Sequence, residues 1–462
     1  MTGRYKVYLE NSDSNSEWLG EIPAHWIVSK FAYVKTVLTD YTANGSFADL
    51  KKNVAYKDEP SFARLVRLTD LRKDLDNDGV WIDESAYNYL KKSALFGGEF
   101  LLANVGAYAG LFYQMPYNKG PASLAPNMFM AKFSQTKILP EFMAYVGQSD
   151  PINKQLTLNA TASSAQPKLN KDDFKSIKFC YPSLIEQQKI AGFLDHETAK
   201  IDTLIAKQEK LIELLKEKRQ AVISHAVTKG LNPNAPMRDS GVEWLGEVPE
   251  HWSVGRYKFC NDRVIVGIAE AATHAYAEDG VPLIRSTNIK DDCELSGEFL
   301  YLKEEFAASN ATKMLFENDV VTVRTGYPGV SAVVPKELNK SQCFTNLVAT
   351  PNKNSEPYFL SNFLNSHLGK SYFALQGWGS AQQNISVPIL ENTPIALPPQ
   401  QEQIELCNFI REARKKYNNL VGKAELSIRL MKERKTALIS AAVTGKIDVR
   451  DFVSEQGQPQ GV

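Results

Sequence analysis

The stretches EWLGEIPAHW (Glu17–Trp26) and EWLGEVPEHW (Glu243–Trp252) are nearly identical, and together they hold four of the six tryptophans in the chain. A second matching pair, EKRQAVISHAVTKG (Glu217–Gly230) and ERKTALISAAVTGK (Glu433–Lys446), lies 216 positions apart. The regions between these pairs match only faintly. Repetition at such a long period predicts two copies of one structural unit, whose ends are alike and whose middles have diverged.

The segments 182–230 and 398–447 carry long helical patterns. In the first, apolar residues recur at gaps of three and four from Ile190 to Val222, with no glycine or proline between Gly192 and Gly230. Each segment begins at a proline, which suits a helix start. A helix of this length would span roughly 60 Å and needs a partner for its apolar stripe. We expect the two segments to pair within the chain; two separate seams with other molecules are the alternative.

The middles, 27–181 and 253–397, combine short β-branched runs with short helical patches and many Gly, Asn and Pro breaks. That mixture predicts an α+β fold with a mixed or antiparallel sheet in each middle. About 150 residues is enough for an independent core. The remaining predicted segments are an N-terminal arm and docking tag (1–26), a linker with the second tag (231–252) and a disordered tail (448–462).

Composition fits a soluble, cytoplasmic protein. The chain is 43% hydrophobic and 23% charged, with a formal net charge of zero and five scattered cysteines without a CxxC pair. No apolar run of about 18 residues predicts a membrane span, the N-terminus lacks a signal-peptide core, and the cysteine spacing argues against a zinc site. Neutrality leaves two possibilities: no nucleic-acid partner, or local basic faces balanced by acidic surface elsewhere.

Familiar catalytic motifs are missing from the sequence. There is no GxxxxGK[ST] loop, no GxGxxG turn opening a helix, no HExxH and no GxSxG elbow. His25 and His251 lie inside the repeated tags, where we interpret them as hydrogen-bonded packing residues rather than ligands. The pattern favours a non-catalytic binding protein. A coiled-coil scaffold whose two globular units bind protein or peptide is an alternative, and an enzyme with an unrecognised site is another.

The combination Trp-Leu-Gly-x-[Ile/Val]-Pro-x-His-Trp, a variable domain, and a helix ending in Ala-[Val/Leu]-Ile-Ser-x-Ala-Val-Thr, all repeated once, resembles the specificity subunit of type I restriction-modification systems. The resemblance covers essentially the full chain. It implies two target recognition domains, each reading one half of a bipartite, asymmetric DNA target, separated by an antiparallel coiled coil that sets the spacer. Two copies of a DNA methyltransferase subunit would dock on the chain, and endonuclease/translocase subunits would complete the complex. No cofactor is expected on this chain, since S-adenosylmethionine would bind the methyltransferase, and ATP and Mg²⁺ the endonuclease.

Candidate DNA contacts are polar residues at positions occupied in both copies, next to glycine turns that allow close approach of the backbone. Arg and Lys would read guanine or phosphate, and Asn and Gln would read adenine. In the first unit they are Arg67, Thr69, Arg72, Asn104, Tyr108, Gln166 and Lys168, and in the second Arg285, Thr287, Asn288, Arg324, Tyr327, Gln382 and Asn384. The predicted partner-docking residues are Trp18, Leu19, Pro23, Trp26, Trp244, Leu245, Pro249 and Trp252.

Overall fold

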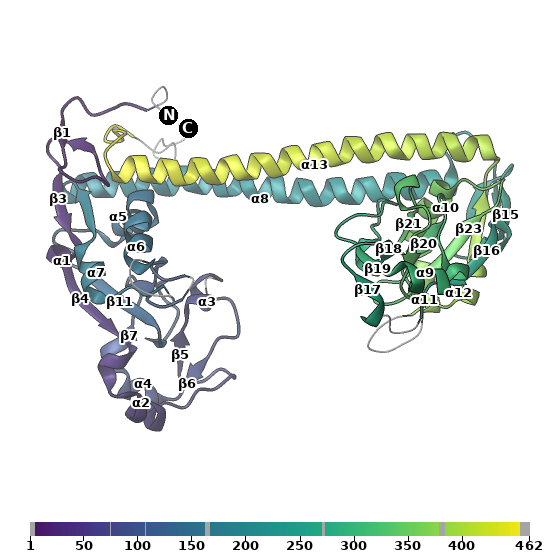
Figure 1. Cartoon of the computed structure of the whole chain (residues 1–462). Coiled ribbons are helices and arrows are strands. Elements are labelled where there is room, and N and C mark those ends of the chain that lie inside the picture. Colours follow the sequence, from purple (N-terminus) through teal and green to yellow (C-terminus); the bar gives the residue numbers. More distant parts are fainter. Residues whose placement is uncertain are drawn as a thin grey trace. The chain divides into compact units, whose positions relative to one another are not determined.

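The computed structural model describes residues 5–73, 75–106, 108–161, 167–269, 273–377 and 384–452 (Figure 1). The chain divides into two compact units. Unit 1 comprises Met1–Lys207 and Ser427–Val462, and unit 2 comprises Gln208–Leu426. Gln166 and Gln382, two of the predicted DNA contacts, lie outside the described residues.

Unit 1 is built around two four-stranded sheets. The first, in the order β4-β11-β8-β9, is antiparallel throughout: Lys35–Asp40, Met128–Phe133, Phe100–Ala103, Phe112–Gln114. The second has the order β6-β5-β10-β7, with β5 and β10 parallel: Trp81–Ile82, Ala63–Val66, Ala122–Leu124, Ala94–Leu95. Two two-stranded sheets complete the unit: β1 (Asn11–Asp13) pairs with β2 (Glu21–Pro23), and β3 (Ile27–Lys30) pairs with β12 (Lys178–Tyr181). The helical elements are α1 (Phe31–Val34), η1 (Tyr41–Asn44), α2 (Phe47–Asn53), α3 (Leu68–Leu71), α4 (Glu84–Tyr89), η2 (Lys91–Ser93), α5 (Pro140–Gln148), α6 (Asp150–Thr161) and α7 (Lys171–Ser176).

Unit 2 repeats the order of the antiparallel sheet and the parallel pair of the second sheet, whose edge strands differ. Its antiparallel sheet has the order β16-β23-β20-β21: Asn261–Val266, Leu347–Pro351, Val320–Thr322, Ser331–Val333. Its second sheet has the order β17-β19-β18-β22, again with one parallel pair, β18 and β22: Tyr276–Ala277, Leu300–Leu302, Val281–Ile284, Gln342–Cys343. The short pairs return as β13 (Met237–Asp239) with β14 (Glu247–Pro249), and β15 (Ser253–Arg256) with β24 (Pro394–Leu397). The helical elements are η3 (Tyr257–Cys260), η4 (Thr273–Ala275), η5 (Ser286–Asn288), α9 (Glu304–Ser309), η6 (Ala311–Lys313), η7 (Lys336–Leu338), α10 (Pro357–Leu364), α11 (His367–Gln376) and α12 (Val387–Glu391).

Two long helices, α8 (Leu184–Lys229) and α13 (Gln400–Val443), each contribute to both units. In unit 1, Leu194 of α8 shares a hydrophobic cluster with Leu438 of α13. In unit 2, Val227 of α8 shares one with Ile410 of α13. The first part of each helix therefore packs with the last part of the other, as in an antiparallel coiled coil. The predicted fold class, an α+β repeat with two paired long helices, is confirmed.

The predicted apolar stripe of α8 is only partly buried. Ile190 and Ile201 are 0% and 5% exposed, whereas Leu204 and Leu211 are 50% and 42% exposed. The physical reason is that a two-helix pair covers one seam, so apolar side chains on the flanks of the stripe stay in contact with water.

The beginning of the predicted disordered tail, 448–462, instead packs against unit 1. The backbone of Lys6 bridges that of Asp448, Val449 is 3% exposed, and the ring of Phe452 lies 5.0 Å from the ring of Phe193. Two isolated apolar residues in a polar stretch give no periodic signal, so their packing could not be expected from the sequence. Residues 453–462 lie outside the described part of the chain.

Candidate nucleic-acid interface

Three separate segments of unit 1 bring predicted DNA contacts together. The guanidinium carbon of Arg72, just after α3, lies 4.8 Å from the ring centroid of Tyr108. In the loop that contains Tyr108, Val105 forms a β-bridge with Lys168. Arg72, Tyr108 and Lys168 all have exposed side chains, so they form one polar surface that a ligand can reach.

Unit 2 assembles the corresponding segments in the same way. The hydroxyl of Tyr327 donates to the carbonyl oxygen of Ser286 at 3.0 Å, which ties its loop to η5. In the same loop, Thr325 forms a β-bridge with Asn384. Tyr327 and Tyr108 have the same exposed fraction, 49%. The two units thus arrange the same segments in the same way, whereas the bridging residue differs: Lys168 in unit 1 and Asn384 in unit 2.

A glycine shapes the loop below each tyrosine. Gly106 has φ +94° and Gly326 has φ +93°, values in the left-handed region that residues with a Cβ rarely adopt. The backbone N–H of Gly106 donates to the carbonyl oxygen of Pro167 at 2.9 Å, which joins this loop to the Lys168 segment. Because the turn is fixed by backbone geometry, the tyrosine is presented from a defined position.

The base of each surface is a buried capping residue. Asp70 is 0% exposed and accepts hydrogen bonds from the backbone N–H of Arg67, at 2.9 Å, and from its guanidinium. In unit 2, Asn288 accepts from the backbone N–H of Arg285 at 3.0 Å. Asn288, one of the predicted DNA contacts, also donates to two backbone carbonyls and is 2% exposed. Its amide is fully used in holding the turn.

The other predicted contacts differ in how far they reach the surface. Thr69 and Thr287 are exposed, whereas Asn104 and Arg324 are half-buried. The carbonyl oxygen of Asn104 accepts from Leu169 N–H at 2.9 Å, which holds the Lys168 segment of unit 1 in place. In unit 2, the carbonyl oxygen of Arg324 accepts from Ile385 N–H at 3.0 Å and holds the Asn384 segment in the same way. The Arg67 side chain is 42% exposed despite its ion pair with Asp70.

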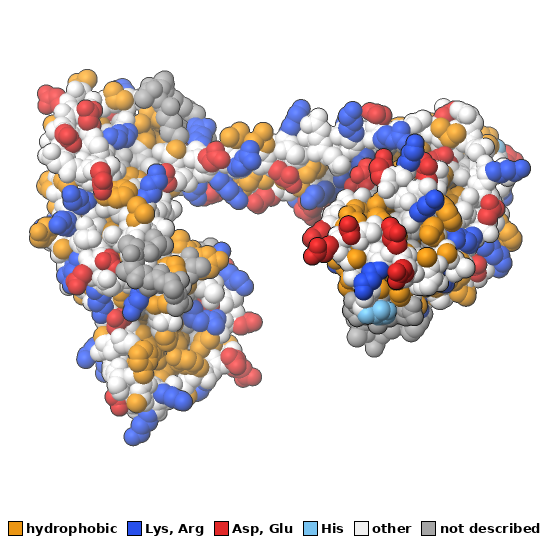
Figure 2. Space-filling model, in the orientation of Figure 1, with side chains coloured by type: hydrophobic (Ala, Val, Ile, Leu, Met, Phe, Trp, Pro, Cys, Tyr) orange, Lys and Arg blue, Asp and Glu red, His pale blue; other side chains and the backbone are white. Residues whose placement is uncertain are grey.

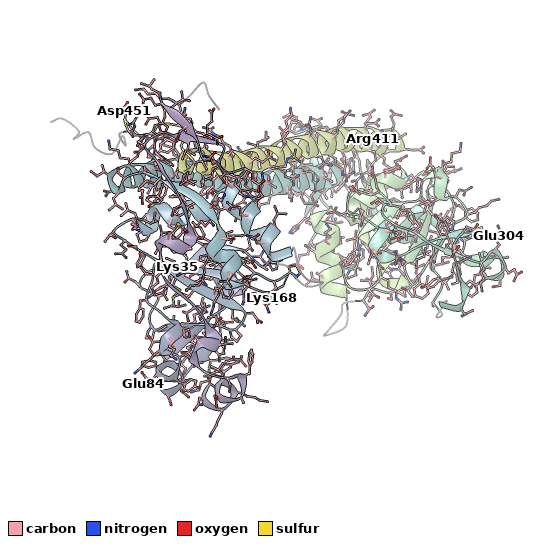
Figure 3. All side chains as sticks on the ribbon, turned by 60° about the vertical axis from the view of Figure 1, so that its left-hand side comes forward. Lys35, Glu84, Lys168, Glu304, Arg411 and Asp451 are labelled. Atoms are coloured by element: carbon pink, nitrogen blue, oxygen red, sulfur yellow. The ribbon has the colours of Figure 1, made fainter. Side chains whose placement is uncertain are left out.

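Helix α6 links the polar surface of unit 1 to the long helices. Its first residue, Asp150, donates its backbone N–H to the hydroxyl of Ser440 on α13 at 3.0 Å. At its other end the carbonyl oxygen of Ala160 accepts from Lys168 N–H at 2.7 Å. A helix of this length spans about 18 Å. Figure 3 shows Lys168 at the end of α6 that points away from α8 and α13.

Helix α11 has the corresponding place in unit 2. The backbone N–H of its first residue, His367, donates to the hydroxyl of Ser224 on α8 at 3.0 Å. Ser224 and Ser440 are the serines of the repeated Ile-Ser motif, 216 positions apart. The repetition therefore has a structural reason, since each serine anchors a helix of its own unit.

The repeated tags pack inside their own units. The indole N–H of Trp26 and the ring of His25 both bond to Glu186, at 3.1 and 2.9 Å, near the start of α8. Trp252 and His251 do the same with Glu402 near the start of α13, at 3.1 and 2.8 Å. The interpretation of both histidines as hydrogen-bonded packing residues is confirmed.

This packing places most of the tag side chains that were predicted to dock a partner inside their own unit, and their role in docking stays a prediction. Buried residues cannot contact a second protein without rearrangement, and their apolar surface is already covered by this chain. The buried members are Leu19, Pro23, Trp26, Leu245, Pro249 and Trp252, whereas Trp18 and Trp244 are half-buried. The Trp244 ring stacks on Tyr372, with centroids 5.2 Å apart.

A buried glutamine follows each of these glutamates and was not singled out from the sequence. Gln187 donates to the carbonyl oxygens of Lys137 and Pro182 and accepts from Leu139 N–H. Gln403 makes the equivalent three bonds in unit 2. The sequence did contain a signal for this glutamine, because Gln occupies the same position in both copies of the repeated amphipathic helix. The Glu-Gln pair fixes the start of each long helix to the rest of its unit.

Basic and acidic side chains are interspersed over the face of each unit that Figure 2 shows. Among the described residues, no group of three or more His, Cys, Asp or Glu side chains is placed to hold a metal ion. None of the helices in the described ranges is long and apolar enough to cross a membrane.

Comparison with known proteins identifies the class. Residues 51–214 and 269–419 match the model of the type I restriction modification DNA specificity domain. The chain is 24% identical over 334 residues to the type I restriction enzyme MjaVIII specificity subunit of Methanocaldococcus jannaschii, covering 70% of this chain and 74% of that protein. It is 20% identical over 409 residues to the EcoKI specificity subunit of Escherichia coli, covering 85% and 83%.

Solved structures share the fold. A chain from a structure of type I R-M complex assembly and conformational transition has a TM-score of 0.65 at 15% identity, covering 91% of this chain and 98% of that one. The HsdS subunit from Thermoanaerobacter tengcongensis gives a TM-score of 0.51 at 13% identity, covering 92% and 98%. Since the matching family model spans both units, the chain belongs to the type I restriction-modification DNA specificity family, as a specificity subunit.

Proposed function

We propose that each unit reads one half of a bipartite, asymmetric DNA target on behalf of a type I restriction-modification complex. The supporting observation is that the same three-segment surface is assembled twice around an exposed tyrosine, Tyr108 in unit 1 and Tyr327 in unit 2. The residue that bridges to the tyrosine loop differs between the units: Lys168 in unit 1 and Asn384 in unit 2. A shared frame with divergent polar side chains suits two readers of different sequences, because base edges are distinguished by the donors and acceptors presented to them.

A neutral chain can serve this role when partners carry part of the phosphate contact. Net charge is zero, and strong non-specific affinity for DNA requires many phosphate contacts from Lys and Arg. We propose that two methyltransferase subunits dock on the chain and supply much of that contact. Side chains that read bases then need suitable geometry more than a large positive charge.

The paired helices are proposed to set the spacer between half-sites. A helix advances about 1.5 Å per residue and is stiffer than a flexible linker, so it can fix a distance along the duplex. Chemistry is proposed to reside in the partners: S-adenosylmethionine on the methyltransferase, ATP and Mg²⁺ on the endonuclease/translocase subunits. This chain would then transfer no methyl group and cut no DNA by itself.

A matched pair of variants tests the assignment of one half-site to each unit. Tyr108→Ala and Tyr327→Ala remove the same residue, at the same 49% exposure, from the two loops. Each would be assembled with methyltransferase subunits and assayed on the target and on DNAs altered in one half-site. A lost base contact costs about 1–3 kcal/mol. We expect each variant to lose discrimination at a different half. If both variants affected the same half, or neither had any effect, the proposal would be wrong.

A further inference from the structure

An open apolar pocket lies beside the last turns of α8 in unit 2. Its volume is about 470 Å³, and its lining includes Val222, Ala226 and Leu231 from the α8 side and Phe409 from α13. Phe409 is 40% exposed and Leu231 is 44% exposed. Two large apolar side chains around one cavity leave an apolar surface that would be stabilised by a partner.

Unit 1 contains the same position of the repeat in a filled state. Phe193 and Ile447 are the residues 216 positions from Phe409 and Leu231, and each is only 2% exposed. Two aromatic rings from the ends of the chain cover Phe193: Tyr5 at 5.6 Å and Phe452 at 5.0 Å between ring centroids, both edge-to-face. In unit 1, therefore, aromatic side chains fill this position of the repeat.

We infer that the pocket beside Phe409 is a docking site for an aromatic side chain of the methyltransferase subunit, an inference that rests on the proposed function. Unit 1 supplies the template, because there the equivalent Phe193 packs edge-to-face with two aromatic rings. Aromatic pairs of this geometry contribute beyond their buried area. Phe409 is 40% exposed, and among the described residues of unit 2 no aromatic ring covers it as Tyr5 and Phe452 cover Phe193, so we assign that ring to the methyltransferase subunit.

The charged residue at the rim of the pocket further restricts which kind of partner segment can bind there. Lys218 and His225 line the pocket and are exposed. In unit 1 the segment that supplies the ring carries Asp451 next to Phe452, and Asp451 pairs with Lys6 at 2.8 Å. The Lys218 ammonium beside an apolar floor fits an aromatic residue flanked by an acidic one. The site therefore selects a segment like Asp451–Phe452, presented by the partner.

The two ends of the helical pair are therefore unequal as docking surfaces. At the unit 1 end the chain covers its own site, whereas at the unit 2 end the site is open to a partner. The partner's aromatic ring is expected to stabilise the methyltransferase subunit bound at unit 2 and to make no such contact at unit 1.

The test measures assembly of the full chain with its methyltransferase subunit by native mass spectrometry and titration. Phe409→Ala should weaken one of the two binding events at least tenfold, about 1.4 kcal/mol. Phe316→Ala is the matched control, since Phe316 is 45% exposed in the same unit and lies away from the pocket. Phe452→Ala, which uncovers the site in unit 1, should not weaken either event. Equal binding of wild type and Phe409→Ala would overturn the inference.

A second measurement does not depend on how well Phe409→Ala folds. A photo-reactive benzoylphenylalanine placed at Leu231 should crosslink to the methyltransferase subunit next to an aromatic residue; a folded complex without that crosslink contradicts the inference. Failure of the proposed function gives a different result, because the wild-type chain would then bind no methyltransferase, or the assembled complex would not methylate a bipartite target. If only the inference about the pocket is wrong, the wild-type chain still binds the methyltransferase and the assembled complex still methylates a bipartite target.

Discussion

The indole N–H of Trp26 donates a 3.1 Å hydrogen bond to a carboxylate oxygen of Glu186, which stands near the start of α8. The hydroxyl of Tyr8 donates to the same oxygen at 2.7 Å, and His25 bonds to the other oxygen. One buried carboxylate thus joins the N-terminal arm, the tag and a long helix. The recurrence of the bond between Trp252 and Glu402 explains why the Trp-bearing phrase is present twice.

Glu186→Ala should loosen the N-terminal tag. Without the carboxylate, the buried indole N–H of Trp26 and the hydroxyl of Tyr8 lose their acceptor, and an unsatisfied buried donor costs about 1–3 kcal/mol. Hydrogen exchange followed by mass spectrometry should show faster exchange across 17–26 and unchanged exchange across 243–252. Glu213→Ala, at an exposed position of α8, is the control. Unaltered exchange in the tag of the Glu186 variant would show that the carboxylate is not needed there.

Ser440→Ala and Ser224→Ala should each destabilise the start of one recognition-domain helix. Each hydroxyl accepts a backbone N–H at a helix N-terminus, at 3.0 Å in both units. Loss of such an acceptor costs about 1 kcal/mol. We expect increased exchange at α6 in the first variant and at α11 in the second. The two variants act as controls for each other, and a change in the same helix for both would contradict the account.

Asp70→Asn should destabilise unit 1 at neutral pH. Burial raises the pKa of Asp70, but hydrogen bonds from the side chains of Arg67 and Asn77 outweigh it and leave the pKa below its ordinary value. A carboxyl with a lowered native pKa stabilises the fold above its unfolded pKa, and that contribution is lost as pH falls through the native value. Asn288 holds the equivalent turn in unit 2, so the neutral side chain fits sterically.

Urea denaturation from pH 7 to pH 3 measures this effect. We expect Asp70→Asn to lower the free energy of unfolding by about 1–3 kcal/mol at pH 7, with a difference from wild type that shrinks as the acid limit is approached. Asp76→Asn, where the side chain is 79% exposed, should behave as wild type across the range. A pH-independent difference for Asp70→Asn would mean that its ionisation does not contribute.

The sequence predicted the fold through features that occur twice. The period between the Ile-Ser motifs, the long helical patterns that begin at Pro182 and Pro398, and the β-branched middles led to a duplicated α+β unit with two paired helices. These signals are local or periodic, so they can be recognised in both copies even though the sequences of the two middle regions differ.

The candidate site was only partly predictable. Polarity and nearby glycines led to the prediction of Arg72, Tyr108 and Lys168 as DNA contacts. The structure shows that all three are exposed and that their segments are neighbours. The same reasoning could not separate Asn288, which is buried as a cap, from its exposed neighbour Thr287. That difference depends on the direction of a side chain within one turn, which neither composition nor spacing contains. Their contact with DNA stays a prediction.

The most direct test of the central claim is methylome sequencing of cells in which residues 27–181 are replaced by the corresponding segment of another specificity subunit. If unit 1 reads one half of a bipartite target, the methylated motif should change in that half alone, with the other half intact. Replacement of 253–397 should change the complementary half. A motif that changes in both halves after either replacement, or in neither, would contradict the assignment of one half-site to each unit.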